Sequence, residues 1–183
     1  IKEYFANYYL HRSDITFDFL HQNEKKIHSN VAEPWKVTIV DTGLNTMTGG
    51  RIRRIRDYIG NETFMLTYGD GVCDLNILDL TAYHKKGGKL ATMTAILPGG
   101  RFGTLSIGKD NVVSHFAEKR KEDGGWINGG YMVLEPEIFN YIEGDFTTFE
   151  RETLARFSAE GQLQAYQYDG FWQCMDTMRD KML

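Results

Sequence analysis

The 183-residue sequence has few cysteines and prolines and no long apolar run. Its two cysteines, Cys73 and Cys174, lie far apart and match no zinc-ligand spacing, which excludes a disulfide-rich or zinc-ribbon domain. No stretch reaches the ~18 consecutive apolar residues of a membrane helix, and the first residues lack the pattern of a signal peptide. The sequence therefore predicts a reduced, cytoplasmic protein with no membrane partner.

The sequence also lacks an excess of positive charge. The net charge is −4, which argues against a nucleic-acid partner. Hydrophobic residues make up 42% and charged residues 25%, as in ordinary globular proteins. We therefore expect a single domain over residues 1–183. The chain begins with Ile1 rather than Met, so we expect it to be a fragment or a processed product.

Hydrophobic periodicity predicts alternating strands and helices. The strand–helix–strand pattern over 64–97 implies parallel strands joined by a right-handed crossover, typical of an α/β fold. Residues 21–34 are polar and predict a loop. The expected strands are 14–20, 35–40, 64–68, 90–97, 104–107, 112–119, 131–134 and 162–168. The expected helices are 1–12, 50–59, 75–86, a short one at Pro136, one from a capping box at Thr147–Glu150 to Glu160, and one that Asp176 begins.

Asp70 follows an apolar strand and precedes a glycine. Ligands of open α/β sheets bind beyond the carboxyl ends of the strands, where a carboxylate can hold Mg²⁺. Spacing alone favours the alternative that Asp70-Gly71 is merely a turn. Asp176, taken alone, is more simply the N-cap of the last helix. Paired with Asp70, it makes a two-carboxylate metal site plausible.

Two further segments suit a phosphorylated ligand. Thr48-Gly49-Gly50-Arg51 opens a helix whose N–H groups and guanidinium could hold an anion, although an ordinary Thr-capped helix is the alternative. Lys119 could pair with a phosphate, while Glu118 and Asn128 could bind sugar hydroxyls; a surface ion pair and a tight turn are the alternatives. No serine-hydrolase elbow, complete Walker loop or dinucleotide-binding fingerprint is present in the sequence. The residues themselves therefore predict an α/β domain that binds a phosphorylated ligand.

Five segments in order resemble the sugar-1-phosphate nucleotidylyltransferases, most closely their cytidylyl branch. The segments are 31–43, Met47-Thr-Gly-Gly-Arg51, Thr67-Tyr-Gly-Asp-Gly-Val72, Ile127-Asn-Gly-Gly130 and Phe171-Trp-Gln-Cys-Met-Asp-Thr-Met-Arg-Asp-Lys181. The resemblance implies a three-layer α/β/α, Rossmann-like fold with a mixed, mostly parallel sheet. It also implies a Mg²⁺-dependent enzyme that joins CTP and α-D-glucose 1-phosphate to give CDP-glucose and pyrophosphate, for dideoxysugar and surface-polysaccharide synthesis. A homo-oligomer, a hexamer, is expected.

The resemblance also assigns roles to residues. It implies Asp70 and Asp176 as Mg²⁺ ligands and, with Lys119, as the catalytic set. The other implied contacts are Thr46, Arg51 and Gly69 with Asp70 for the nucleotide, and Gly103, Glu118, Lys119 and Asn128 for the sugar phosphate.

The chain departs from the family pattern in three places. Arg120 and Cys174 stand where prolines are usual, and the family's initial strand and Gly-rich triphosphate loop are absent. The chain is therefore expected to be an N-terminally truncated nucleotidyltransferase domain, which leaves its own activity open. The alternatives are a transferase of the same fold that uses dTTP, UTP or ATP, a non-catalytic nucleotide-sugar binding module, or a metal-dependent glycosyltransferase.

Overall fold

The computed structural model describes residues 1–98, 104–107, 113–117 and 125–182. The described chain forms two compact units, one within 1–41 and one within 42–183. Whether 1–183 acts as one domain, as the composition predicts, stays a prediction. Among the described helices, none is long and apolar enough to cross a membrane.

The first unit is a β-hairpin preceded by two short helices, α1 (Lys2–Ala6) and α2 (Tyr8–His11). Strand β1 (Ser13–Asp18) pairs antiparallel with β2 (Glu24–Asn30). The loop predicted over 21–34 is therefore wrong at the residues that form β2. Every residue of β2 is exposed, and for that reason its sequence carries no alternation of apolar and polar side chains. The strand predicted over 35–40 is also wrong, because this segment pairs with no strand among the described residues.

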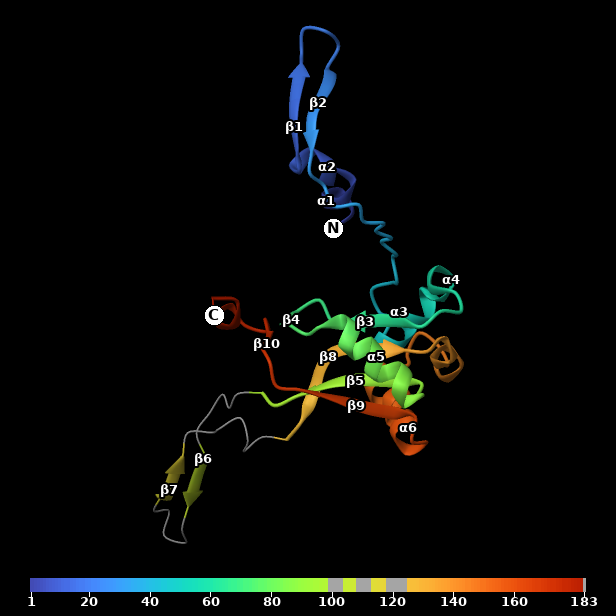
Figure 1. Ribbon diagram of the computed structural model, residues 1–183, viewed down its shortest axis with the longest axis vertical. Helices are drawn as coiled ribbons and strands as arrows, with labels where there is room; N and C mark the ends of the chain where they lie inside the picture. Colours follow the sequence, from blue (N-terminus) through green and yellow to red (C-terminus); the bar gives the residue numbers. More distant parts are fainter. Residues whose placement is uncertain (99–103, 108–112, 118–124, 183) are drawn as a thin grey trace. The chain divides into compact units, whose positions relative to one another are not determined.

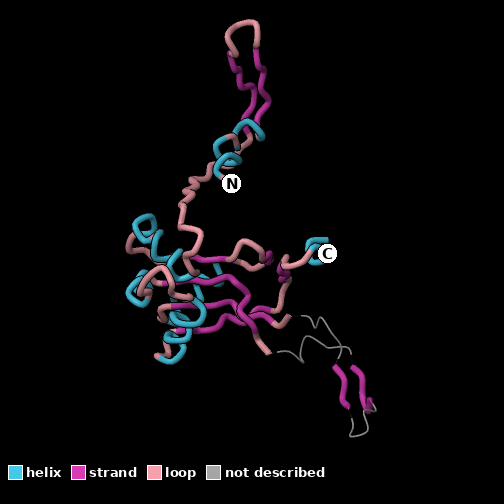
Figure 2. The backbone as a smooth tube through the Cα atoms, turned by 180° about the vertical axis from the view of Figure 1, so that it is seen from behind, coloured by secondary structure: helices cyan, strands magenta, loops and turns pink. Residues whose placement is uncertain are grey.

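The second unit is built on a four-stranded sheet in the order β3-β8-β5-β9, seen from opposite sides in Figures 1 and 2. The strands are β3 (Phe64–Thr67), β8 (Ile127–Leu134), β5 (Ala91–Ile96) and β9 (Leu163–Tyr168). β5 and β9 are parallel, whereas β8 is antiparallel to both of its neighbours. Three strands therefore run in one direction, which confirms a mixed sheet. The predicted crossover over 64–97 joins β3 to β5, but β8 lies between them.

Helices cover both faces of this sheet. Helix α5 (Ile77–Gly87) begins where the Asn76 side chain accepts a hydrogen bond from the Leu78 N–H, and it ends at Gly88, whose φ of +60° suits glycine. Its Leu80 packs on Val133 of β8. Residues of β8 that face the opposite way form a second buried cluster with helical segments of this unit at 48–54, 136–141 and 149–159. That second cluster contains Ile52, Ala91, Met132, Leu134, Ile138, Phe139, Ile142, Phe149, Leu154 and Phe157.

Shorter elements complete the unit (Figure 1). They are α3 (Thr48–Arg54), α4 (Arg56–Ile59), β4 (Gly71–Cys73), the 3₁₀ segment η2 (Pro136–Tyr141), the π-helical turn η3 (Phe149–Thr153), α6 (Leu154–Ala159), β10 (Trp172–Cys174) and α7 (Met178–Met182). The strands predicted over 104–107 and 112–119 are confirmed in their described parts, β6 (Thr104–Ile107) and β7 (Val113–Ala117), which pair antiparallel.

A buried histidine joins α5 to the amino end of β5. Nδ1 of His84 lies 2.6 Å from Oγ1 of Thr92, and Nε2 lies 2.9 Å from Oε1 of Glu135. A carboxylate can only accept, so Nε2 of His84 donates to Glu135. In the neutral imidazole Nδ1 then accepts from the Thr92 hydroxyl, whose oxygen accepts from Nε2 of Gln164 at 2.7 Å.

Candidate functional site

The carboxyl ends of β3, β5 and β9 meet the start of β8 at one edge of the sheet. Ile96 at the end of β5 pairs with Tyr168 at the end of β9 and with Ile127 at the start of β8. Beyond β3, the Tyr68 N–H donates to the Gly130 carbonyl at 3.3 Å. Ligands of α/β sheets bind at such an edge, so the candidate site lies here.

Strand β8 carries a bulge at this edge. Met93 pairs with Met132 and Ala95 with Asn128, so one residue of β5 lies opposite three residues of β8. Gly129 and Gly130, which lie within this bulge, are both buried, and Gly130 has a φ of +81°. A bulge bends its strand and redirects the neighbouring side chains. The paired glycines therefore shape the position of Asn128.

Asp70 and Asp176 lie at the same end of a two-stranded ribbon. β4 pairs antiparallel with β10, with Gly71 opposite Cys174. One step further, the Met175 N–H donates to the Asp70 carbonyl at 2.7 Å. The two aspartates are thus brought to the same end of the ribbon, although 106 positions separate them in the sequence.

Two side-chain hydrogen bonds fasten this ribbon to β8. Nε1 of Trp172 donates to the Gly129 carbonyl at 2.7 Å, and the Tyr131 hydroxyl donates to the Gly71 carbonyl at 2.8 Å. Asp74 closes the ribbon by accepting hydrogen bonds from the Tyr168 hydroxyl and the Phe171 N–H. The bond to Asp74 raises the pKa of Tyr168 to about 12, so this phenol stays protonated at neutral pH.

The chemistry of the aspartate pair suits Mg²⁺. Both residues are exposed, so the pair lies open to solvent rather than enclosed. No cluster of three or more His, Cys, Asp or Glu side chains suited to a metal occurs in the described part of the chain. Mg²⁺ commonly takes only one or two protein carboxylates and completes its coordination with water and substrate phosphates. An open pair of carboxylates therefore fits this ion.

The N-cap interpretation of Asp176 is wrong. Thr177 caps α7 instead: its Oγ1 accepts from the Asp180 N–H at 3.2 Å, and the Asp180 carboxylate accepts from the Thr177 N–H at 3.0 Å. The turn interpretation of Asp70 is correct as local structure, since Gly69 and Asp70 form a turn between β3 and β4. A turn and a metal ligand are compatible at that position.

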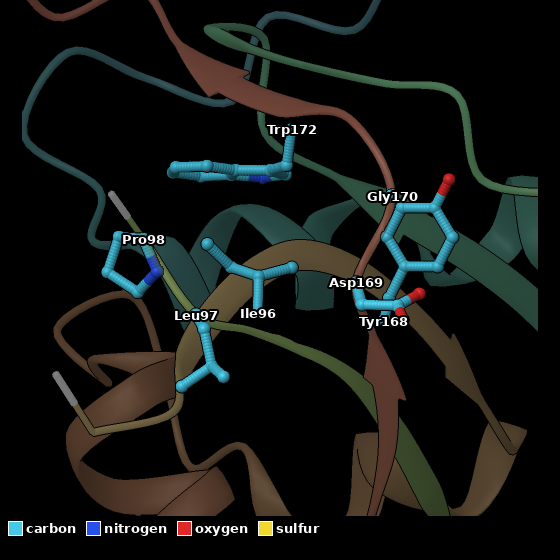
Figure 3. A pocket seen from close by; sticks show the side chains of 7 residues that line it. All are labelled: Ile96, Leu97, Pro98, Tyr168, Asp169, Gly170 and Trp172. Atoms are coloured by element: carbon cyan, nitrogen blue, oxygen red, sulfur yellow. The ribbon is translucent and has the colours of Figure 1, made fainter. Parts of the chain in front are cut away.

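A pocket of about 90 Å³ opens at the same edge, at the ends of β5 and β9. Figure 3 shows the Trp172 indole facing Ile96 and Pro98. Tyr168 and Asp169 line another part of the wall. An aromatic face beside polar groups is a common arrangement for a small polar ligand. The sequence alone does not predict this pocket, because two distant segments, 96–98 and 168–172, come together only in the fold.

The start of α3 is packed against protein. The Gly49 N–H donates to the Thr147 carbonyl at 2.9 Å. A Cβ atom at Gly50 would lie 2.5 Å from the Asp145 carbonyl oxygen, so these glycines permit close packing. The idea that the first N–H groups of α3 hold an anion is therefore wrong for Gly49, whose N–H is already bonded.

Two residues predicted to bind the nucleotide, Thr46 and Arg51, lie on either side of these glycines. Thr46 is buried, with 7% of its surface exposed. The exposed Arg51 donates to Oγ1 of Thr42 at 2.7 Å and to the Leu44 carbonyl at 3.2 Å, so its guanidinium braces the loop before α3. Neither contact tests a role in nucleotide binding, which stays a prediction.

A chain of hydrogen bonds runs from α3 to the start of β8. Oε2 of Glu150 accepts from the Thr48 hydroxyl at 2.7 Å, and Oε1 accepts from the Tyr68 hydroxyl at 2.7 Å. The Tyr68 oxygen accepts from Nδ2 of Asn128 at 3.3 Å, and Oδ1 of Asn128 accepts from the Gly130 N–H at 2.8 Å. The predicted sugar-contacting Asn128 is therefore part of a connected network.

The charge state of this network follows from its surroundings. Burial and the hydrogen bond to Glu150 raise the pKa of Tyr68. Burial disfavours the charged Glu150, but the hydrogen bonds from Thr48 and Tyr68 outweigh it and lower the pKa of this carboxyl. Glu150 is thus an ionised acceptor and Tyr68 a protonated donor at neutral pH.

The capping box predicted from Thr147 to Glu150 is wrong. The Glu150 carboxylate binds Thr48 and Tyr68, and Oε1 of Glu152 instead accepts from the Thr148 N–H at 2.6 Å. The glutamate that caps this helical segment is thus Glu152, two residues after the predicted Glu150. The segment begins with the π-helical turn η3. Three further predicted site residues, Gly103, Glu118 and Lys119, lie outside the described residues.

The chain was compared with known proteins. A scan of protein-family profiles finds no match. Among solved structures, HddC from Yersinia pseudotuberculosis has a TM-score of 0.57 at 23% identity, covering 76% of this chain and 61% of that one. UDP-glucose pyrophosphorylase in complex with UDP-glucose has a TM-score of 0.55 at 16% identity, covering 77% and 61%. These likenesses, with the sheet described above, define the fold as that of the nucleotidyltransferases.

Sequence relatives narrow the class further. A glucose-1-phosphate cytidylyltransferase of Salmonella typhimurium is 51% identical over 183 residues, which is all of this chain and 70% of that protein. A mannose-1-phosphate guanyltransferase of Saccharomyces cerevisiae is 27% identical over 177 residues, covering 93% of this chain and 47% of the yeast protein. The chain belongs to the glucose-1-phosphate cytidylyltransferase family. It spans about 70% of the length of the Salmonella relative and about three fifths of the solved structures.

Proposed function

We propose that this chain transfers a cytidylyl group from CTP to α-D-glucose 1-phosphate, giving CDP-glucose and pyrophosphate. The observation that carries the proposal is the 51% identity to the Salmonella enzyme along all 183 residues. Relatives that bear a guanylyl name are only 27% identical, so a different base is less well supported. The arrangement of Asp70 and Asp176 at the sheet edge is consistent with this chemistry.

In the proposed reaction a phosphate oxygen of glucose 1-phosphate attacks the α-phosphorus of CTP, and pyrophosphate leaves. No protein nucleophile is needed, because positioning and charge stabilisation are sufficient for such transfers. We assign Lys119 to neutralise the phosphate of the sugar. Glu118, Asn128 and Gly103 would contact the sugar itself.

The nucleotide would be held by the loop and turn on either side of β3. Thr46 precedes α3, Arg51 lies within α3, and Gly69 leads into Asp70 after β3. A Cβ at Gly69 would meet no atom within 4 Å, so this turn is open to a bulky ligand. The carboxylates of Asp70 and Asp176 would hold Mg²⁺, which supplies positive charge to phosphate oxygens when bound.

The direct test incubates the chain with Mg²⁺, glucose 1-phosphate and each nucleoside triphosphate in turn, and measures nucleotide sugar and pyrophosphate. CTP should give the highest kcat/KM. Equal rates with dTTP, UTP or ATP would refute the base assignment. Mg²⁺-dependent CTP binding without turnover, measured by calorimetry, would instead identify a non-catalytic binding module.

The metal assignment predicts a specific loss. Asp70→Asn keeps the size of the side chain but removes its charge, and we expect kcat/KM to fall about 10²–10³-fold, as when one electrostatic contact to a transition state is removed. Asp57→Asn on α4 is the matched control, because that exposed carboxylate lies outside the proposed site. Turnover by Asp70→Asn close to that of Asp57→Asn would refute the metal role.

Three properties of the whole enzyme remain part of the proposal. We propose that it acts in the cytoplasm as a homo-oligomer, a hexamer, and that its product enters dideoxysugar synthesis. Analytical ultracentrifugation of the purified chain tests the assembly state. A monomer at all concentrations would refute it for this chain.

A further inference from the structure

The proposed reaction gives no role to Glu150, yet its side chain links two elements of the site. Its two carboxylate oxygens receive hydrogen bonds from two different elements, Thr48 of α3 and Tyr68 after β3. We propose that Glu150 is a positioning residue that acts through Tyr68 to fix the side-chain amide of Asn128 for binding the sugar phosphate. This inference rests on the proposed function, which places Asn128 at the sugar.

The orientation of the Asn128 amide follows from its two contacts. The Gly130 N–H can only donate, so the atom 2.8 Å from it must be the amide oxygen of Asn128. The amide nitrogen then faces the Tyr68 oxygen at 3.3 Å. That contact is attractive only if the phenol oxygen accepts, which requires the phenol proton to point elsewhere.

Glu150 is the acceptor of the Tyr68 phenol proton. Its Oε1 lies 2.7 Å from the Tyr68 oxygen, and a carboxylate can only accept. A charge-assisted hydrogen bond of this kind is stronger than a neutral one. Glu150 therefore decides the direction of the whole chain: the phenol donates to it, and the phenol oxygen is left to accept from Asn128.

Glu150 is itself held in place. The Thr48 hydroxyl accepts from the Phe149 N–H at 2.9 Å, which directs its own proton to Oε2 of Glu150. The residue also stands in the π-helical turn η3, an irregularity that proteins use frequently at functional sites. Two fixed hydroxyls and an irregular turn therefore hold one half-buried carboxylate.

The Tyr68 ring cannot easily move away. A Cβ atom at Gly130 would lie 2.9 Å from Cδ2 of Tyr68, so the ring packs directly on the backbone of β8. With both ends fixed, one N–H and one oxygen lone pair of the Asn128 amide remain beyond the two bonds described. A sugar hydroxyl, which both donates and accepts, matches that pair.

The test compares two single variants and their double variant. In Glu150→Gln, one of the two hydroxyls faces an NH₂ group and loses its acceptor; in Tyr68→Phe, Asn128 loses its partner. Each should raise KM for glucose 1-phosphate about tenfold, the usual effect of losing one oriented hydrogen bond. Tyr68→Phe should leave KM for CTP within about twofold, because the Thr48–Glu150 contact persists. The double variant should have a KM for glucose 1-phosphate no higher than that of the more impaired single variant, because both changes break the same hydrogen-bond chain to Asn128.

The chain offers a matched control pair. The Tyr141 hydroxyl donates to Oε2 of Glu160 at 3.1 Å, a second tyrosine–carboxylate bond that lies at the end of α6. Tyr141→Phe and Glu160→Gln should leave both KM values within about twofold of the wild type. If the Tyr68 and Glu150 variants change KM for glucose 1-phosphate no more than these controls, the positioning role is overturned.

A measurement without turnover separates this proposal from the proposed function. In ¹³Cζ-tyrosine NMR at neutral pH, with Tyr68 assigned by Tyr68→Phe, Glu150→Gln should shift the Tyr68 resonance, because the phenol loses its carboxylate acceptor. In ¹⁵N spectra, Glu150→Gln should change the side-chain amide signal of Asn128, whereas Glu160→Gln should not. An inactive wild-type chain with these NMR changes would overturn the proposed function but support the positioning; an Asn128 signal that ignores Glu150→Gln would overturn the positioning.

Discussion

Replacing His84 by leucine tests the buried network between α5, β5 and β8. His84 is 1% exposed, and both of its ring nitrogens are hydrogen bonded. Leucine fills most of the same space and keeps α5 helical. The change therefore removes the two polar contacts while it largely preserves packing.

The expected cost can be worked out bond by bond. Thr92 is fully buried, so its hydroxyl loses its acceptor without access to water, which costs about 1–3 kcal/mol. Glu135 is about one-third exposed and still accepts from the Thr63 hydroxyl at 2.8 Å, so water can replace the histidine there at a cost below about 1 kcal/mol. The free energy of unfolding should fall by about 1–4 kcal/mol in total.

The assay is urea unfolding followed by circular dichroism, with the free energy taken from the midpoint and slope. Thr92→Val supplies the second corner of a double-mutant cycle. Because the double variant removes both the donor and its partner, it should be less destabilised than the sum of the singles, by about 1 kcal/mol. A loss below about 0.5 kcal/mol for His84→Leu, or strict additivity in the cycle, would refute this reasoning.

Two further predictions concern Asp145 and Gly130. Hydrogen bonds from the Arg54 guanidinium at 2.9 and 2.6 Å lower the pKa of Asp145, so its stabilising effect is present above about pH 4 and is lost as the pH falls through the lowered pKa. Asp145→Asn should therefore flatten the loss of stability below about pH 4 in urea titrations, and an unchanged slope would contradict the assignment. Gly130→Ala should cost about 2 kcal/mol or more, because φ is +81° and the new Cβ would meet the Tyr68 ring; Gly125→Ala, with open space around it, is the control in thermal unfolding, and equal Tm values would contradict the packing.

The parts of the fold that local sequence determines were predicted well. Helix α5 was expected over 75–86 and is observed at Ile77–Gly87, because its cap at Asn76 and its stop at Gly88 are both local signals. The strand pattern at 35–40 failed for the opposite reason. Alternation shows that a segment could pair, but the existence of a neighbouring strand is decided elsewhere in the chain.

The candidate site was predicted only in part. Asp70 and Asp176 were chosen by position and resemblance, and the β4–β10 ribbon does bring them to one end. Glu150 was missed as a site residue, because Thr147-Thr-Phe-Glu150 matches a local capping pattern. Its actual partners, Thr48 and Tyr68, lie 102 and 82 positions away, a separation that no short pattern can encode.

The ribbon of β4 and β10 also bears on how the protein is made. All four strands of the main sheet lie before Asp169, whereas the strand that brings Asp176 to Asp70 follows it. On the ribosome, the sheet can therefore assemble before the acidic pair exists, and the pair is completed only after the segment that follows Asp169 has emerged. A chain cut before Trp172 would keep every strand of that sheet and lack the second carboxylate.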